Sequence, residues 1–83
     1  MAIETLTEQA AQNLADGITA LGAGLSVGLA GIGTGLGEIG IGAAAVGATA
    51  ENRDLFSLSL IFVAIPETLV IFGLVISLIL IYS

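Results

Sequence analysis

Two long apolar stretches, separated by a short polar cluster, dominate the pattern of this chain. Residues 17–50 are mostly glycine, alanine and aliphatic, and Glu38 is their one charged position. Residues 55–82 are richer in leucine, isoleucine, valine and phenylalanine, and Glu67 is their one charged position. At about 1.5 Å per residue, each stretch can cross a hydrocarbon core about 30 Å thick as an α-helix. The pattern predicts an all-α membrane protein, built as an antiparallel hairpin of two transmembrane helices.

The polar residues that flank these stretches predict the remaining segments. Residues 1–16 form a polar N-terminal segment in which apolar side chains recur at helical spacing, so we expect a short surface helix there. Residues 51–54 read Glu51-Asn52-Arg53-Asp54 and predict a turn at the membrane surface. Since cytoplasmic loops attract basic residues, Arg53 favours a cytoplasmic loop with both termini on the opposite side.

Composition and charge exclude several classes of function. The chain of 83 residues is 57% hydrophobic and carries one basic and seven acidic side chains, for a formal net charge of −6. Nucleic-acid binding is excluded, because neutralising phosphates requires many lysines and arginines. Histidine and cysteine are absent, so no His or Cys metal site is expected. We expect no catalysis by this chain alone and no cofactor, although oxygen ligands for a hard cation remain.

Nucleotide-binding motifs do not change this picture. Residues 35–40 match G-x-G-x-x-G, but they lie within the Gly/Ala stretch and not between a strand and a helix. No G-x-x-x-x-G-K-[ST] motif occurs, so any ATP chemistry must take place on another chain.

The two carboxyls within the apolar stretches are the main functional candidates. A charged side chain at the centre of a bilayer costs about 2.5–3.5 kcal/mol on insertion scales, which marks Glu67 as functional. Counted from Asn52, Glu38 and Glu67 each lie roughly 21–23 Å along their helices. A hairpin therefore places both carboxyls at the same depth. Two neighbouring carboxyls in a medium of low dielectric constant favour a shared proton or an intervening cation.

Neighbouring groups could complete such a site. The Thr68 hydroxyl can donate to a carboxylate, ligate a cation, or bond back to its own helix. Pro66 removes the hydrogen bond to the carbonyl of residue 62 and predicts a helix kink. Alternatively, Glu67 is a satisfied carboxyl at a helix contact, and Glu38 is a permanently protonated partner that only forms hydrogen bonds.

Glycines at helical repeats predict close helix packing. Small residues four apart let the backbones of membrane helices approach one another. Their distribution on all sides of the first helix indicates several neighbours. The glycines concerned are Gly24, Gly28, Gly31, Gly33, Gly35 and Gly37.

The glycine repeats, the polar loop and the carboxyl in mid-helix resemble the c subunit, the rotor-ring proteolipid of rotary ATPases, over residues 17–82. The finer resemblance is to the archaeal and vacuolar-type branch, whose second helix carries Pro-Glu-Thr, as in Pro66-Glu67-Thr68 here. The loop of that branch often runs Ala-Glu-Asp-Pro-x-x-Phe. Residues 50–56 follow this pattern without its proline.

The resemblance implies a homo-oligomeric ring in membrane lipid, with residues 17–50 inside and residues 55–82 outside. It implies that Glu67 binds and releases one H⁺ or Na⁺ each time it passes a stator subunit bearing an essential arginine. It also implies that the loop Glu51, Asn52, Arg53 and Asp54 docks on central-stalk subunits.

The resemblance further implies an ion-ligand set of Glu67, Glu38, Thr68 and the backbone carbonyl of Ile65. Sodium-binding members carry a glutamine at each of two positions that are Glu38 and Leu69 here. Losing an oxygen at Leu69 argues against Na⁺, whereas a carboxylate at Glu38 favours a cation, so Na⁺ remains possible at Glu67, Glu38 and Thr68. The alternatives to a rotor ring are a small oligomeric channel or a structural assembly peptide.

Overall fold

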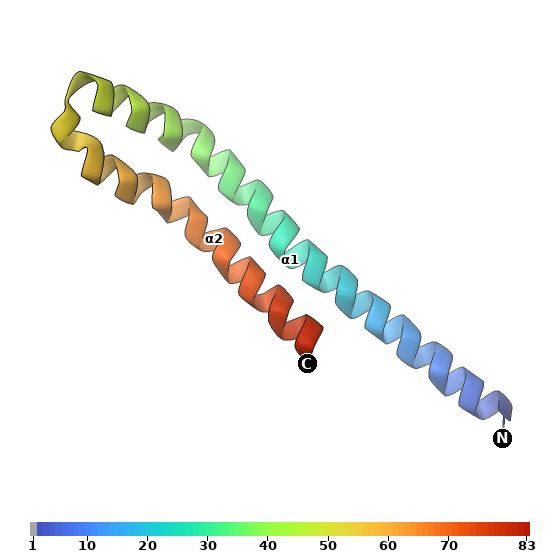
Figure 1. The fold of residues 1–83 in the computed structure, drawn as a ribbon. Coiled ribbons are helices and arrows are strands. Elements are labelled where there is room, and N and C mark those ends of the chain that lie inside the picture. The colour runs from blue at the N-terminus through green and yellow to red at the C-terminus, as the bar shows by residue number, and fades with distance from the viewer. Residues whose placement is uncertain (1) are drawn as a thin grey trace.

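The computed structural model describes residues 2–83 as a single helical hairpin (Figure 1). Helix α1 spans Ala2–Glu51, a 3-10 turn η1 spans Arg53–Leu55, and helix α2 spans Phe56–Tyr82. The described residues measure 74 × 18 × 9 Å, so the hairpin is long and flat. The two antiparallel helices lie side by side, so the hairpin has two broad faces and two narrow edges. The all-α hairpin expected from the apolar pattern is confirmed.

Helix α1 is longer than expected, because it contains 50 residues without a break. The polar segment is therefore the first part of α1 and not a separate short helix. Neither proline nor a capping turn interrupts the chain near residue 16, and side chains four apart support the helix there. Gln12 Nε2 donates to Asp16 Oδ1 at 2.9 Å, and Gln9 Nε2 donates to Asn13 Oδ1 at 3.3 Å.

The turn between the helices is held by Asn52. Its backbone N–H donates to the Ala48 carbonyl at 2.9 Å, which completes the last turn of α1. Its side-chain Oδ1 accepts from the Asp54 N–H at 3.0 Å, so Asn52 also caps the short η1 turn. The polar cluster at residues 51–54 therefore forms the tight turn that the sequence predicts.

Helix α2 continues through Pro66 without a break in its 27 residues. Figure 1 shows α1 and α2 bending together on the loop side of their midpoints. A proline lacks the N–H needed for the helical hydrogen bond to the carbonyl four residues earlier, so α2 is weakened in this region. The α1 ribbon follows the same course, and the two helices remain in contact.

Small and hydroxyl-bearing residues line the contact between the helices. Ala23 and Thr34 are the buried residues of α1, and Pro66, Gly73 and Ser77 are those of α2. The Ser77 hydroxyl donates to the carbonyls of Ala23 and Gly73. Such hydrogen bonds and close backbone contacts join helices in lipid, where hydrophobicity alone does not drive them together.

The large apolar side chains of α1 point away from α2. At about 100° per residue, Leu21, Leu25 and Ile32 lie on the opposite side of α1 from the buried Ala23 and Thr34. They are among the exposed side chains, and Leu21 is 62% exposed. Both helices are long and apolar enough to cross a membrane, with mean hydropathies of 1.4 and 2.4. An outer surface of this kind suits lipid or neighbouring protein and not water.

Candidate ion-binding site

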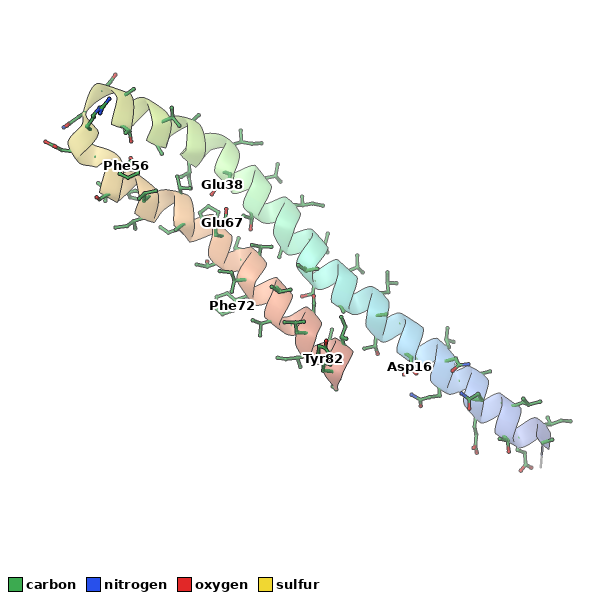
Figure 2. The ribbon with its side chains drawn as sticks, viewed as in Figure 1. Asp16, Glu38, Phe56, Glu67, Phe72 and Tyr82 are labelled. Carbon is green, nitrogen blue, oxygen red and sulfur yellow. The ribbon has the colours of Figure 1, made fainter. Side chains whose placement is uncertain are left out.

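The site is centred where Gly37 of α1 meets Pro66 of α2. A Cβ placed on Gly37 would lie 3.3 Å from the Pro66 Cβ, so the helices touch at this level. Glu38 directly follows Gly37, and Glu67 directly follows Pro66. Because the helices are antiparallel, the residue after the contact turns toward the same broad face in both. Figure 2 shows both carboxyls at one level along the hairpin. The matched depth expected from the sequence is therefore present.

The Glu38 side chain is half-buried, and its Oε1 atom is buried with no hydrogen-bond partner among residues 2–83. A buried polar oxygen without a partner is costly, by about 1–3 kcal/mol or more. The protein therefore presents an acceptor oxygen at the level of Glu67 that is ready for a proton or a cation. If Glu38 only formed hydrogen bonds, the partner of its Oε1 atom would have to lie outside the described hairpin.

Thr34 is a buried residue of the site that the sequence analysis missed. Its Oγ1 donates to the Pro66 carbonyl at 2.8 Å and joins the two helices next to the carboxyls. Thr34 lies one helical turn before Glu38, on the side of α1 that faces α2. The sequence carried one signal for this residue: Thr34 stands between two glycines and lies four residues before Glu38.

Glu67 and Thr68 are exposed in the single hairpin. The Thr68 hydroxyl donates to the Ile65 carbonyl at 2.7 Å, which is the bond to its own helix that we considered as an alternative. Two oxygens of the expected ligand set, Thr68 Oγ1 and Ile65 O, thus lie beside each other. Within residues 2–83, Glu38 Oε1 forms no hydrogen bond with either of them.

The available ligands on this face are all oxygens. No group of three or more His, Cys, Asp or Glu side chains could hold a metal ion within residues 2–83. What this face offers is two carboxyls, a hydroxyl and backbone carbonyls, all of them oxygen ligands. Oxygen ligands are those that hard cations prefer.

Most of the glycines expected at helix contacts do not contact α2. Gly37 touches Pro66, whereas a Cβ added at Gly24, Gly28, Gly31, Gly33 or Gly35 would meet nothing within 4 Å. Their role in helix packing stays a prediction. The glycine that fixes the hairpin is Gly73 of α2, where a Cβ would lie 2.7 Å from both the Ala30 Cβ and the Ser26 carbonyl oxygen. The sequence analysis did not select Gly73, although it is the only glycine in its helix.

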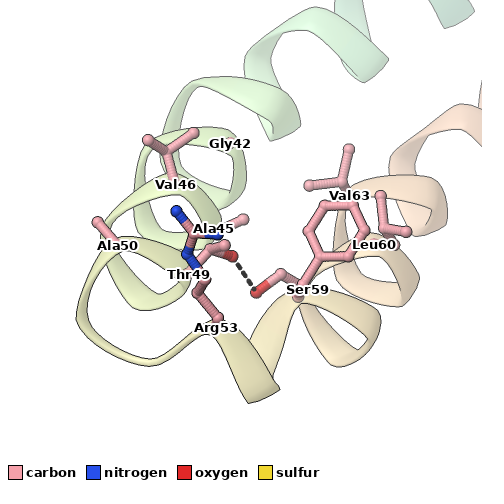
Figure 3. Close-up of a pocket in the computed structure, with 10 residues that line it drawn as sticks. Gly42, Ala45, Val46, Thr49, Ala50, Arg53, Ser59, Leu60 and Val63 are labelled. Carbon is pink, nitrogen blue, oxygen red and sulfur yellow. Dashed lines mark hydrogen bonds between the residues drawn. The ribbon is translucent and has the colours of Figure 1, made fainter.

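The loop end of the hairpin opens into an apolar groove of about 790 Å³ (Figure 3). Small residues such as Gly42 and Ala45 form its α1 wall, and Phe56 and Leu60 line its α2 wall. Figure 3 shows the Arg53 side chain directed away from the turn along the α1 wall. Arg53, the only basic residue of the protein, therefore lies at the loop end, where docking on a stalk is expected.

Comparison with known families decides the identity of the hairpin. The family model that describes the c subunit of ATP synthase matches residues 21–80, which is most of the chain and includes both carboxyls. The chain belongs to the ATP synthase c-subunit family. No curated protein matches the chain. As a member of this family, it is an integral membrane, non-catalytic subunit of the rotor ring of an ATP synthase.

Removing the Thr34 hydroxyl should loosen this c-subunit hairpin beside its carboxyls. We expect Thr34→Val to lower the stability of the ring by about 0.6 kcal/mol per copy, the mean for interhelical hydrogen bonds in membranes. Thr34→Ser keeps the donor and should retain most of that stability. The temperature at which the detergent-solubilised ring dissociates measures both effects. Equal losses in the two variants would show that the hydroxyl contributes nothing.

Proposed function

We propose that this chain forms the ion-translocating rotor ring of an ATP synthase of the archaeal and vacuolar-type branch. Glu67 binds and releases one H⁺ or Na⁺ each time it passes the stator. The supporting observation is the placement of Glu38 and Glu67 at one depth and on one broad face, beside the Gly37–Pro66 contact. Pro66-Glu67-Thr68 supports the branch.

The glycines of α1 support assembly into a closed ring. At about 100° per residue, Gly24, Gly28 and Gly35 lie on one broad face of the hairpin, and Gly33 and Gly40 lie on the other. A Cβ at any of them meets nothing within the hairpin, so both faces are open to a neighbour. Two different open faces on each copy allow a head-to-tail interface, which forms a ring when the rotation between copies closes. In this ring α1 lies inside and α2 outside.

The mechanism follows from the medium that surrounds Glu67. When it faces lipid, its charge must be neutralised by a proton or Na⁺, because an ionised carboxylate in hydrocarbon is costly. When it reaches an aqueous half-channel near the stator arginine, the ion leaves and the carboxylate is stabilised by water and by the cation beside it. The membrane potential supplies roughly 2.3 kcal/mol per charge per 100 mV, so several ions must pass for each ATP.

An adjacent copy would complete the ion site, because proposed ligand residues are exposed in the single hairpin. Glu67 and Thr68 are exposed in one hairpin, and Glu38 Oε1 has no partner within residues 2–83. A neighbour packed on this face would cover part of Glu67 and bring further oxygens to the ion. The loop at residues 51–54 would dock on the central stalk from the cytoplasm, with the termini on the other side. The partners are then lipid, further copies, the stator and the stalk.

A water-filled channel fits the structure less well. The side of α1 that would face the centre of an assembly carries large aliphatic side chains such as Leu25 and Ile32. The glycines lie on the lateral faces, where they would meet neighbours. A pore requires polar groups along its length, and the two carboxyls occupy a single depth.

Carbodiimide labelling of the assembled complex tests the proposal and identifies the ion. The reagent should modify the protonated carboxyl of Glu67, located by mass spectrometry, and labelling should stop ATP-driven transport. In a sodium ring, Na⁺ at neutral or alkaline pH would slow labelling, because the ion replaces the proton. In a proton ring, pH alone would set the labelling rate. Glu51 in the loop is the internal control, since Na⁺ should not affect its labelling. Exclusive labelling of other acids would contradict the role of Glu67.

A further inference from the structure

Helix α1 extends well beyond the end of α2. Near the end of α2, Ser77 is hydrogen-bonded to Ala23, and Leu80 lies 3.9 Å from a Cβ placed on Gly22. Residues 2–16, which we call the N-terminal extension, continue the same helix past this point, as the blue end of Figure 1 shows. They project about 22 Å at 1.5 Å per residue. This segment has no role in the ion site or in the contact between α1 and α2.

The N-terminal extension is amphipathic, and its orientation is fixed by the rest of α1. Leu14 lies at the same angle as Leu21 and Leu25, on the side away from α2, and Ile3 lies close to it. Ile3 is 78% exposed and Leu14 is 66% exposed. The polar Gln12 and Asp16 are turned to the opposite side. In a ring with α1 inside, the apolar side chains would therefore face the axis and the polar ones would face outward.

Small residues also continue along the two lateral faces. Gly17 and Ala10 extend the face that carries Gly24 and Gly28, whereas Ala15 and Ala11 extend the face that carries Gly33. These are the faces that meet neighbouring copies in the proposed ring. Ala10 and Ala11 differ in height by only about 1.5 Å, so they face each other across adjacent copies in a symmetric ring.

An amphipathic helix can also lie on a membrane surface, but the charge of the N-terminal extension argues against that. Residues 1–52 contain no lysine or arginine, and the extension carries Glu4, Glu8 and Asp16. Helices that lie on membranes are rich in basic residues, and anionic lipid would repel this one. In addition, Figure 1 shows that the extension prolongs α1 without a bend, so a hairpin that spans the membrane would carry it out of the bilayer.

We propose that the N-terminal extensions of neighbouring copies pack side by side into a helical collar outside the membrane. The Ala10–Gly17 edge of one copy contacts the Ala11–Ala15 edge of the next. The apolar Ile3 and Leu14 then turn toward the axis, and Asp16 turns away from it, while Glu4 and Glu8 lie beside the Ala11–Ala15 edge. This collar rests on the proposed ring and adds an interface between copies beyond the bilayer.

Disulfide cross-linking of the assembled ring tests the collar, and the absence of cysteine makes the chain suited to it. In the variant Ala10→Cys/Ala11→Cys, oxidation should link neighbouring copies into a ladder that extends to the complete ring. The variants with Ala10→Cys or Ala11→Cys alone should give no ladder, and neither should the outward pair Gln9→Cys/Gln12→Cys. If the outward pair linked copies equally well, or the Ala10/Ala11 pair gave no ladder in an intact ring, the collar would be overturned.

Hydrogen exchange on the unmodified chain gives an independent measurement. Short isolated helices are marginal in water, so the amides of residues 2–16 should exchange freely in the dispersed subunit. In the ring we expect exchange to slow by about tenfold or more, because the collar must open first. Unprotected amides in an intact ring would overturn the collar alone. Failure of the unmodified chain to form any ring, judged by native mass, would instead overturn the proposed function and the collar with it.

Discussion

Replacing Glu67 by glutamine is expected to abolish ion transport coupled to ATP, while the ring still assembles. Glutamine has nearly the same size and keeps its hydrogen-bonding capacity, but it cannot ionise, release a proton or balance Na⁺. Every copy would then remain permanently neutral, and the stator arginine would meet no carboxylate. ATP-driven ion uptake and ATP synthesis in vesicles that contain the whole complex should both fall to background.

Three further variants sharpen this test. Glu67→Asp keeps the charge on a shorter side chain and should leave reduced but coupled transport. Glu38→Gln keeps Glu67 and should change the ion dependence of labelling while transport persists. Asp16→Asn in the N-terminal extension removes an acid outside the apolar stretches and should leave transport intact. Coupled transport by the Glu67→Gln complex at a normal rate would refute the proposed mechanism.

The sequence predicted the hairpin well, because its physical signals are strong and local. Two apolar stretches of membrane length and the polar turn at residues 51–54 define two helices and their connection. Counting from Asn52 then placed Glu38 and Glu67 at one depth, and the Gly37–Pro66 contact bears this out. Depth in an antiparallel hairpin depends only on helical rise, so it can be obtained without knowing how the helices face each other.

The features that the sequence analysis missed depend on how the two helices are rotated. Thr34 and Gly73 matter because each faces the opposite helix, and the apolar pattern does not specify that rotation. The own-helix bond of Thr68 was one of several options, since its neighbours offered other partners. The N-terminal boundary was wrong for a different reason. Polarity changes near residue 16, but a change of solvent does not end a helix whose backbone bonds can continue.

The glycines show most clearly what one chain can and cannot reveal. Spacing alone treated Gly31 and Gly37 alike, because each has another glycine four residues away. In the hairpin Gly37 contacts Pro66, and Gly31 faces open space. One repeat pattern therefore serves two kinds of contact: the fixed pairing of α1 with α2, and surfaces left for further copies in the proposed ring.

The second large effect is expected from Gly73→Ala. An added methyl group would lie 2.7 Å from both the Ala30 Cβ and the Ser26 carbonyl oxygen. The carbonyl belongs to the backbone of α1, so the helices must separate for the methyl to fit. Separation would also weaken the bond from Ser26 Oγ to the Gly73 carbonyl, now 3.0 Å. Overpacking of this kind costs about 1–3 kcal/mol per copy, which should sharply lower the dissociation temperature of the ring.

Two companion variants separate close approach from a general effect of alanine. Gly47→Ala adds the same methyl group where nothing lies within 4 Å and should leave stability nearly unchanged or slightly raised. Combining Gly73→Ala with Ala30→Gly removes one of the two clashing atoms but leaves the Ser26 carbonyl in place. Because the backbone cannot retreat as a side chain can, this double variant should recover only part of the lost stability. Full recovery would assign the whole clash to Ala30, and equal stability of Gly73→Ala and Gly47→Ala would show that the helices have room at their crossing.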